Sequence, residues 1–145
     1  MKIKIVKTDD RAVIPVYKTP GAAAADLRII LDETHVMQPG DIFRARTGLA
    51  IELPEGYVAL ICARSGLASN HGICLANSVG VIDSDYRGEL QITLYNSSRM
   101  AFELEHHMRV AQLMIMPVVQ CEFETVESIS ETERGKGGFG STGVE

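Results

Sequence analysis

Short stretches rich in apolar and β-branched residues recur along this chain, and turn-forming residues separate them. One stretch, E-L-Q-I-T-L-Y at 89–95, alternates apolar and polar residues, which is the pattern of a strand buried on one face. The quartets Q-P-G-D and L-P-E-G lie between such stretches and favour turns. The expected strands are 3–6, 12–17, 26–31, 42–53, 57–62, 73–75, 89–95, 110–119 and 121–126.

The spacing of these stretches indicates the fold class. Long helical periodicity is absent, and only residues 65–70 suggest a helical turn. Many short strands at regular spacing predict an all-β domain, built as an antiparallel sandwich, jelly roll or barrel. Two stretches, V-A-L-I-C at 58–62 and L-M-I-M at 113–116, are apolar on consecutive residues, which indicates burial on both faces. One domain of 145 residues offers limited two-sided burial, so we expect a homo-oligomer.

Composition places the chain among globular proteins and argues against one class of partner. Hydrophobic residues make up 46% and charged residues 23%, which fits a single domain with a hydrophobic core. The net charge of -5 argues against stable binding to nucleic acid, which favours a basic face. A phosphate ligand remains compatible with this charge, because a few local donors can bind one anion.

The cysteines and the N-terminus indicate a reducing compartment. Cys62, Cys74 and Cys121 are odd in number and form no C-x-x-C pair, so we expect buried or half-buried thiols. The first ten residues lack the apolar run of a signal peptide, and no stretch approaches the ~20 apolar residues of a membrane span. We therefore expect a cytoplasmic protein that does not bind membranes.

Two polar segments carry groups suited to phosphate. The first, P-G-A-A-A-A-D-L-R, presents the carboxylate of Asp26 among small residues, and by itself it is best explained as a solvated Asp where a strand begins. In the second, A-R-S-G-L-A-S-N-H-G, Arg64 offers forked donors, Ser65 a hydroxyl and Gly66 close backbone approach. A Ser65 that caps a helical turn beside a surface Arg64 explains the second segment equally well.

A third polar segment, N-S-V-G-V-I-D-S-D-Y-R-G-E, begins at Asn77. The amide of Asn77 carries a donor and an acceptor, which suits the edge of a nucleobase. Asp83 and Asp85 stand two residues apart, and Tyr86 offers a flat ring that could stack on a sugar. A hairpin turn decorated with solvated charges is the commoner origin of such a stretch.

The segment R-G-K-G-G-F-G-S-T-G lies near the end of the chain and is half glycine. Glycine loses more backbone freedom on ordering than other residues, so a ligand or partner must supply the free energy that orders it. Arg134 and Lys136 bring positive charge and Phe139 brings an aromatic ring. The segment lacks the G-K-[ST] ending of a P-loop. A solubilising tail is the alternative, but a lone Phe between glycines favours a functional arm.

Together these segments resemble the homotrimeric deoxyuridine triphosphatases, the dUTPase family. The resemblance implies a jelly-roll-like all-β fold, assembled as a homotrimer with sites shared between subunits. It also implies a catalytic domain over 1–130 and a flexible glycine-rich arm over 131–145 that closes over a site. Five motifs in the family's order carry the resemblance: A-A-A-A-D-L at 22–27, R-S-G-L-A at 64–68, G-V-I-D-S-D-Y-R-G-E at 80–89, R-V-A-Q-L at 109–113 and R-G-K-G-G-F-G-S-T-G at 134–143.

The resemblance further implies a reaction and a role for each site residue. The substrate dUTP would be hydrolysed to dUMP and pyrophosphate with Mg²⁺ as cofactor, which limits uracil in DNA and supplies dUMP for dTMP synthesis. Asp83 would activate the water that attacks the α-phosphorus, and Asp26 would contact hydrated magnesium through water. Tyr86 would pack on the deoxyribose and exclude a 2′-hydroxyl, and Phe139 would stack over the uracil. The remaining implied substrate contacts are Arg64, Ser65, Gly66 and Gln112 for phosphates, Asn77, Gly80, Val81 and Ile82 for uracil, Gln91 on the following strand, and Arg134, Gly140, Ser141 and Thr142 in the arm.

Three alternatives stand beside this interpretation. A dCTP deaminase shares the fold, but that family lacks this form of arm and uses a Glu-centred site. A regulatory protein that keeps the scaffold to sense nucleotide or hold a partner stays open as an added role. A purely structural β-trimer gives no reason for Asp83, Tyr86 and Phe139 to occur together. Turnover of dUTP separates the enzyme from the last two.

Overall fold

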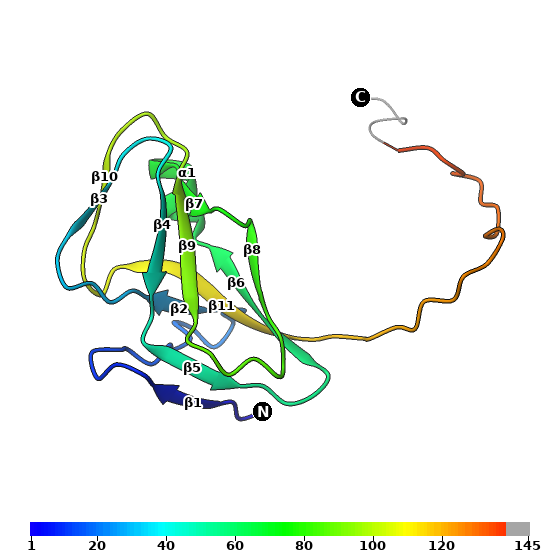
Figure 1. The fold of residues 1–145 in the computed structure, drawn as a ribbon, viewed down its shortest axis with the longest axis horizontal. Coiled ribbons are helices and arrows are strands. Elements are labelled where there is room, and N and C mark those ends of the chain that lie inside the picture. Colours follow the sequence, from blue (N-terminus) through cyan, green and yellow to red (C-terminus); the bar gives the residue numbers. More distant parts are fainter. Residues whose placement is uncertain (139–145) are drawn as a thin grey trace.

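The structure is a computed structural model that describes residues 1–138 of the chain. Within these residues the strands all pair antiparallel and one short helix is present, so the all-β expectation is confirmed (Figure 1). The elements are β1 (Lys4–Lys7), β2 (Ala25–Arg28), β3 (His35–Met37), β4 (Ile42–Arg46), β5 (Leu49–Glu52), β6 (Tyr57–Ala63), α1 (Ser65–His71), β7 (Ile73–Leu75), β8 (Val79–Ile82), β9 (Gln91–Asn96), β10 (Phe102–Leu104) and β11 (Arg109–Pro117).

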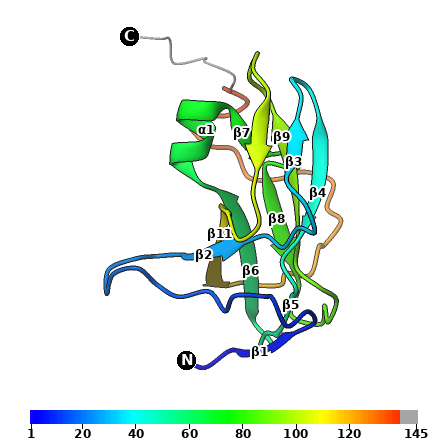
Figure 2. The same ribbon diagram turned by 90° about the vertical axis from the view of Figure 1, so that its left-hand side faces the viewer.

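The strands form two larger sheets and two short ribbons. The first sheet has the order β2-β11-β6-β8 and the second has the order β4-β9-β7, while β1 pairs with β5 and β10 with β3. Figure 2 shows α1 at one end of this sandwich, beyond β6, with β1 and β5 at the other end. The arrangement agrees with the jelly-roll-like sandwich expected from the sequence.

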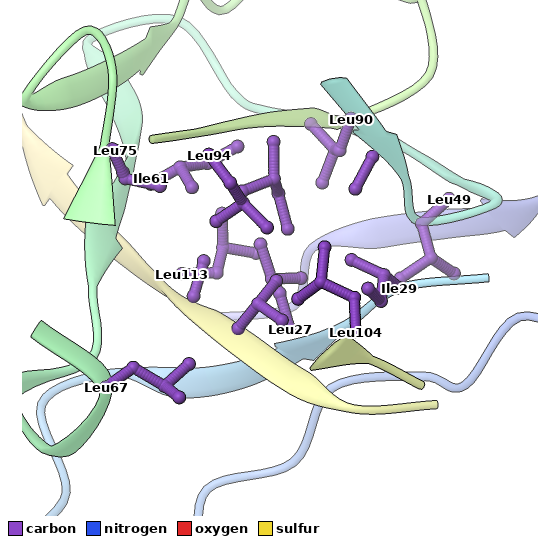
Figure 3. Close-up of a cluster of buried hydrophobic side chains, with 14 of the residues drawn as sticks. Leu27, Ile29, Leu49, Ile61, Leu67, Leu75, Leu90, Leu94, Leu104 and Leu113 are labelled. Atoms are coloured by element: carbon purple, nitrogen blue, oxygen red, sulfur yellow. The ribbon is translucent and has the colours of Figure 1, made fainter. Parts of the chain in front are cut away.

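The hydrophobic core lies between the strands because alternate residues of each strand point inward. Ile92 and Leu94 of β9 are 1% and 0% exposed, and Ile61 of β6 is 2% exposed. Leu27 from β2 and Leu104 from β10 belong to the same buried cluster (Figure 3). This packing holds the first sheet, which carries Asp26, Gln112 and the candidate residues of β8, in a fixed position.

The outer surface of the first sheet is apolar too. Leu60 of β6 lies opposite Val81 of β8 and Met114 of β11. Val81 is 60% exposed, whereas Ala59 and Ile61, which alternate with Leu60, are buried. Of the burial on both faces expected at 58–62 and 113–116, the inner side is confirmed, whereas the outer side lacks a cover within the described part of the chain. This outer apolar face consists of Val58, Leu60, Cys62, Val79, Val81, Met114 and Met116.

Two expected strands are wrong. Residues 12–17 form no strand, and Val16 and Tyr17 are 62% and 56% exposed. Residues 121–126 also form none, and Phe123 is 96% exposed. Both segments have the composition of strands, but a strand needs a partner edge as well as β propensity. Within residues 1–138 no edge pairs with either segment.

Other differences concern boundaries and short strands. The expected strand at 42–53 is two strands, β4 and β5, because the chain turns at Gly48, where φ is 68°. The strands β3, β8 and β10 were not expected, since each has at most four residues and a weak pattern. The helical turn expected at 65–70 is confirmed as α1.

The thiols differ from expectation at one position. Cys62 and Cys74 are half-buried as expected, but Cys121 is exposed because the segment around it does not pack on the sheets. Among the described residues no helix combines the length and apolar character needed to cross a membrane.

Candidate functional site

Asp26 is held by two arginines from different elements. Nη1 of Arg109 donates to Oδ2 of Asp26 at 2.8 Å, and Nε of Arg64 donates to Oδ1 at 3.2 Å. Nη1 of Arg64 also donates to the carbonyl of Arg109 at 2.9 Å. Gln112 lies opposite Asp26 in the ladder between β2 and β11. The side chain of Asp26 is 10% exposed, so its charge is nearly enclosed by these partners.

The ionised form of Asp26 is favoured despite its burial. Desolvation raises the pKa of this carboxyl, but the hydrogen bond from Arg109 and the charge of Arg64 lower it more. The pKa of Asp26 therefore lies below its ordinary value. One carboxylate between two guanidiniums leaves this cluster with a net positive charge, which suits an anionic ligand.

The helix that follows Arg64 settles how the R-S-G-L-A segment folds. Arg64 is the N-cap residue, with φ -87° and ψ 123°, and no side chain caps the helix. The alternative in which Ser65 caps the helix is therefore wrong. Ser65 and Gly66 are the first two residues of α1 and are exposed. They lie beside the Asp26 cluster, because Arg64 is both the N-cap residue of α1 and a hydrogen-bond partner of Asp26.

Asn77 and β8 form a second group of predicted residues. β8 is the outer strand of the first sheet, and Gly80 pairs with Ile61 of β6. A Cβ atom at Gly80 would lie 3.2 Å from Cβ of Ile61 and 3.6 Å from Nδ2 of Asn77, so the Asn77 amide folds toward the strand. Ser78, at φ 63°, makes the tight turn that brings it there. Within residues 1–138, Gly80, Val81 and Ile82 thus present an unpaired strand edge next to the Asn77 amide.

Asp83 and Tyr86 lie in the loop that follows β8. The N–H of Tyr86 donates to the carbonyl of Asp83 at 3.2 Å and closes a turn. Asp83 and Asp85 are exposed and line a surface cavity of about 770 Å³, which Tyr57 and Arg87 also line. The loop therefore carries a carboxylate that a water molecule can reach.

Arg64 and Asp83 lie toward opposite ends of β6, whereas β8 begins opposite Cys62, near the Arg64 end. Arg64 follows Ala63, the last residue of β6, whereas Asp83 shares its cavity with Tyr57, the first. Because β6 has 7 residues, its ends lie roughly 20 Å apart at about 3.3 Å per residue. Arg64 and Asp83 are therefore well separated along the first sheet in the single chain. Gln91, the first residue of β9, is exposed and lies opposite Arg46 of β4.

The arm residues fall partly outside the described part of the chain. Residues 118–138 form neither strand nor helix and lead away from the sheets (Figure 1). Arg134 is exposed, and its Nε donates to the carbonyl of Gly137 at 3.0 Å. Phe139, Gly140, Ser141 and Thr142 lie outside the described residues.

Arg109 is a site residue that sequence reasoning missed. It opens the R-V-A-Q-L motif, from which only Gln112 was selected. Residues three apart in a regular strand point to opposite faces. The register of β11 against β2 shifts between Arg109 and Ala111, however, and such a bulge reverses the alternation. Arg109 and Gln112 therefore both reach Asp26, and no pattern in the sequence predicted the bulge.

Comparison with known proteins identifies the family. The dUTPase family profile matches residues 10–143. The deoxyuridine 5′-triphosphate nucleotidohydrolase of Neisseria meningitidis serogroup A is 48% identical over 145 residues, covering 99% of this chain and 97% of that protein. Its namesake from Thiobacillus denitrificans is 50% identical over 144 residues, covering 99% of both. A solved structure of Staphylococcus bacteriophage 80alpha dUTPase with dUPNHPP has a TM-score of 0.90 at 28% identity, covering 99% of both chains. The chain belongs to the dUTPase family.

Proposed function

We propose that this chain is a dUTP diphosphatase, which hydrolyses dUTP to dUMP and pyrophosphate by attack of water on the α-phosphorus. The proposal rests mainly on the positions of two sets of charged groups along β6. A positive cluster around Asp26 lies at one end of β6, and an exposed carboxylate, Asp83, follows a free strand edge at the other. The activity would limit uracil incorporation into DNA and supply dUMP for dTMP synthesis in the cytoplasm, without stable nucleic-acid binding.

We call the Asp26 cluster and the first turn of α1 the phosphate end of the site. It would hold the triphosphate by its positive charge and by hydrogen-bond donors. Arg64 keeps its forked guanidinium beside the first turn of α1, where Ser65 adds a hydroxyl and Gly66 adds backbone N–H groups. Gln112 adds a side-chain amide from β11. Phosphoryl chemistry depends chiefly on positioning and charge stabilisation, so these donors would account for much of the catalysis.

We call Asn77, β8 and the loop with Asp83 and Tyr86 the nucleoside end of the site. It would bind the base and the sugar. The edge of β8 at Gly80, Val81 and Ile82 offers backbone donors and acceptors to uracil, and the Asn77 amide adds one of each. Tyr86 would pack on the deoxyribose, where a 2′-hydroxyl would find no room. Gln91 would supply a further substrate contact. Asp83 would accept a proton from the attacking water as a general base.

The donor set around Asp26 fits Mg²⁺ that is bound mainly by phosphate oxygens. Within residues 1–138 no three or more Asp, Glu, His and Cys side chains gather into a group that could hold an ion. Magnesium usually keeps several waters and takes one or two carboxylates together with substrate phosphates. The two oxygens of Asp26 offer about four acceptor sites, and Arg64, Arg109 and Gln112 occupy three of them, which leaves one for a magnesium-bound water. When bound, the ion would neutralise phosphate charge.

The distance between Arg64 and Asp83 supports a site that neighbouring subunits share. The outer apolar face of β6, β8 and β11 lies between the Arg64 and Asp83 ends and offers a surface for self-association. We infer a homotrimer in which one subunit supplies the phosphate end and its neighbour the nucleoside end. The arm over 131–145 would close over the site, with Phe139 on the uracil and with Arg134, Gly140, Ser141 and Thr142 near the γ-phosphate.

The first experiment measures pyrophosphate release from dUTP with magnesium, in parallel with dCTP, dTTP and UTP. Release from dUTP alone is the expected result, because the base edge and Tyr86 select uracil and deoxyribose. Equal release from all four would contradict the assigned selectivity. Binding of dUTP without release would instead favour a nucleotide sensor on the same fold.

Subunit sharing is tested by mixing two inactive variants. Arg64→Ala removes the phosphate end and Asp83→Asn removes the nucleophile-activating carboxylate, so each variant alone should be inactive. Co-refolded mixtures should regain activity, up to about a quarter of wild type, because random assembly pairs an intact Arg64 with a neighbour's intact Asp83 in that share of sites. A mixture that stays inactive, while it still forms mixed oligomers, would show that each chain builds its own site.

A further inference from the structure

Glu89 ties the 83–89 loop to the turn between β4 and β5. Its Oε1 accepts a hydrogen bond of 2.8 Å from the N–H of Gly48, and its Oε2 accepts one of 3.1 Å from Nε of Arg46. The side chain of Glu89 is 15% exposed, so both carboxylate oxygens are shielded from water and both are engaged. One side chain thus joins the end of the loop to a different part of the sandwich.

The turn that receives Glu89 is itself well held. Gly48 adopts φ 68°, and a Cβ atom there would lie 2.9 Å from Cβ of Ala12 and 3.0 Å from Cβ of Asp9. The carbonyl of Arg46 accepts the N–H of Ile30 at 2.9 Å, and Nη1 of Arg46 lies 3.8 Å from Oδ2 of Asp9. The turn is therefore held by close packing at Gly48 and by the contacts of Arg46. A rigid turn of this kind can hold the end of the loop in place.

The ring of Tyr86 depends on the backbone of Glu89. The Tyr86 hydroxyl donates to the carbonyl of Glu89 at 3.1 Å. The ring folds over Gly88, where a Cβ atom would overlap the phenol. No other hydrogen bond of the Tyr86 side chain occurs within the described residues. The position of the ring therefore depends on the peptide of Glu89, which the Glu89 side chain anchors together with the backbone bonds of Leu90 to Thr47 and Leu49.

We propose that Glu89 is a positioning residue for sugar selectivity, which holds Tyr86 where it excludes a 2′-hydroxyl. The inference rests on the proposed function, in which Tyr86 packs on the deoxyribose. Glu89 does not touch the substrate in this account. Its side chain binds the β4–β5 turn, and its main-chain carbonyl accepts the hydrogen bond of the Tyr86 hydroxyl.

The substitution Glu89→Gln tests this link with little change in shape. The new amide keeps one acceptor for Gly48, but its NH₂ group faces the guanidinium of Arg46, and two donors cannot bond each other. The Glu89 side chain loses its contact with Arg46, while the backbone of Leu90 keeps its hydrogen bonds to Leu49 and Thr47. The peptide of Glu89 is then held less tightly, and the Tyr86 ring gains freedom to move aside for a ribose. Loss of positioning, with Asp83 still in place, should affect substrate choice more than kcat for dUTP.

The experiment measures kcat and KM for dUTP and UTP with the full-length chain and magnesium. For Glu89→Gln the selectivity, expressed as the ratio of kcat/KM for dUTP to that for UTP, should fall by about tenfold or more, within the range that one hydroxyl commands in a shaped pocket. The matched control is Glu103→Gln, which makes the same change at an exposed residue of β10, a strand that pairs with β3 and not with the loop. Its selectivity should equal that of wild type.

A double-mutant cycle separates positioning from a general loss of structure. In a Tyr86→Phe background the hydroxyl link to Glu89 is absent, so Glu89→Gln should have little further effect on selectivity. Full additivity of the two changes would overturn the inference, as would wild-type selectivity in Glu89→Gln. If Glu89→Gln does not fold, Glu89→Asp, which keeps the charge but shortens the reach, should lower selectivity in the same direction.

Failure of the inference and failure of the proposed function give different results. A wild-type protein that does not release pyrophosphate selectively from dUTP would refute the proposed function and, with it, the inference. Selective wild-type turnover together with an unchanged Glu89→Gln ratio would refute the inference alone.

Discussion

Arg109 donates a hydrogen bond of 2.8 Å to Asp26 from a position where β11 shifts its register. Arg64 approaches the other oxygen of the same carboxylate, so one buried charge organises two guanidiniums. The chain carries a net charge of -5, yet this cluster is locally positive. The proposed site can therefore attract a triphosphate against the charge of the whole protein.

Replacement of Arg109 by methionine should destabilise the fold. Asp26 is 10% exposed and would lose its shorter hydrogen bond, so the unfolding free energy should fall by about 1–3 kcal/mol in urea denaturation. The control Lys4→Met removes an exposed ion pair, whose partners are 78% and 47% exposed, and should change stability by less than ~1 kcal/mol. Equal losses in the two variants would mean that Arg109 is no more than a surface residue.

Stability should depend on the ionisation of Asp26 in acid. The pKa of this carboxyl is lowered in the folded chain, chiefly because the Arg109 hydrogen bond and the Arg64 charge outweigh desolvation. A lowered folded pKa gives stability that is complete above the unfolded pKa, about 3.9 for Asp, and is lost as pH falls through the folded pKa. Below about pH 5 the unfolding free energy of wild type should therefore fall more steeply than that of Asp26→Asn. Parallel curves would contradict this linkage.

Asp83→Asn should separate binding from turnover. The amide cannot take a proton from water, so kcat for dUTP should fall by ~10²-fold or more, while calorimetry should still detect dUTP binding. Asp85→Asn is the matched control, because Asp85 lines the same cavity and carries the same charge. A larger loss of kcat in Asp85→Asn than in Asp83→Asn would reassign the general base.

Gly48 and Gly56 allow a test of packing at positive φ. Both adopt left-handed backbone, at 68° and 78°, so alanine costs about 1 kcal/mol of strain at either position. A Cβ at Gly48 would also press on Ala12 at 2.9 Å, whereas nothing lies within 4 Å of one at Gly56. Gly48→Ala should therefore lose about 1–3 kcal/mol more than Gly56→Ala in thermal or urea unfolding. Similar losses would show that the 46–48 turn relaxes freely.

A charge on the outer apolar face should disrupt assembly. Val81 is 60% exposed in the single chain and lies opposite Leu60, so Val81→Asp should shift sedimentation toward monomer and abolish dUTP turnover. Val36→Asp on β3 adds the same charge at a residue that is 47% exposed outside this face, and should leave the oligomer intact. An active Val81→Asp monomer would contradict both the interface and the shared site.

Much of this protein could be predicted from local patterns. Alternation in β9 and consecutive apolar residues in β6 predicted buried strands, because side chains of an extended chain point to opposite faces in turn. The five motifs also gave candidate residues for the chemistry, among them Asp26, Arg64 and Asp83, and their roles stay predictions. These features depend on residue type and short spacing, which the sequence states directly.

Only the tertiary structure decided which of these residues meet. It places Arg109 on Asp26 through a bulge, and it leaves Arg64 and Asp83 at opposite ends of β6. It also leaves 12–17 and 121–126 without strand partners, although their composition suits strands. The amino-acid sequence by itself thus determined the fold class and the chemical groups. Register, bulges and partner edges were decided by the folded chain, because they depend on contacts between segments far apart in sequence, which local periodicity does not encode.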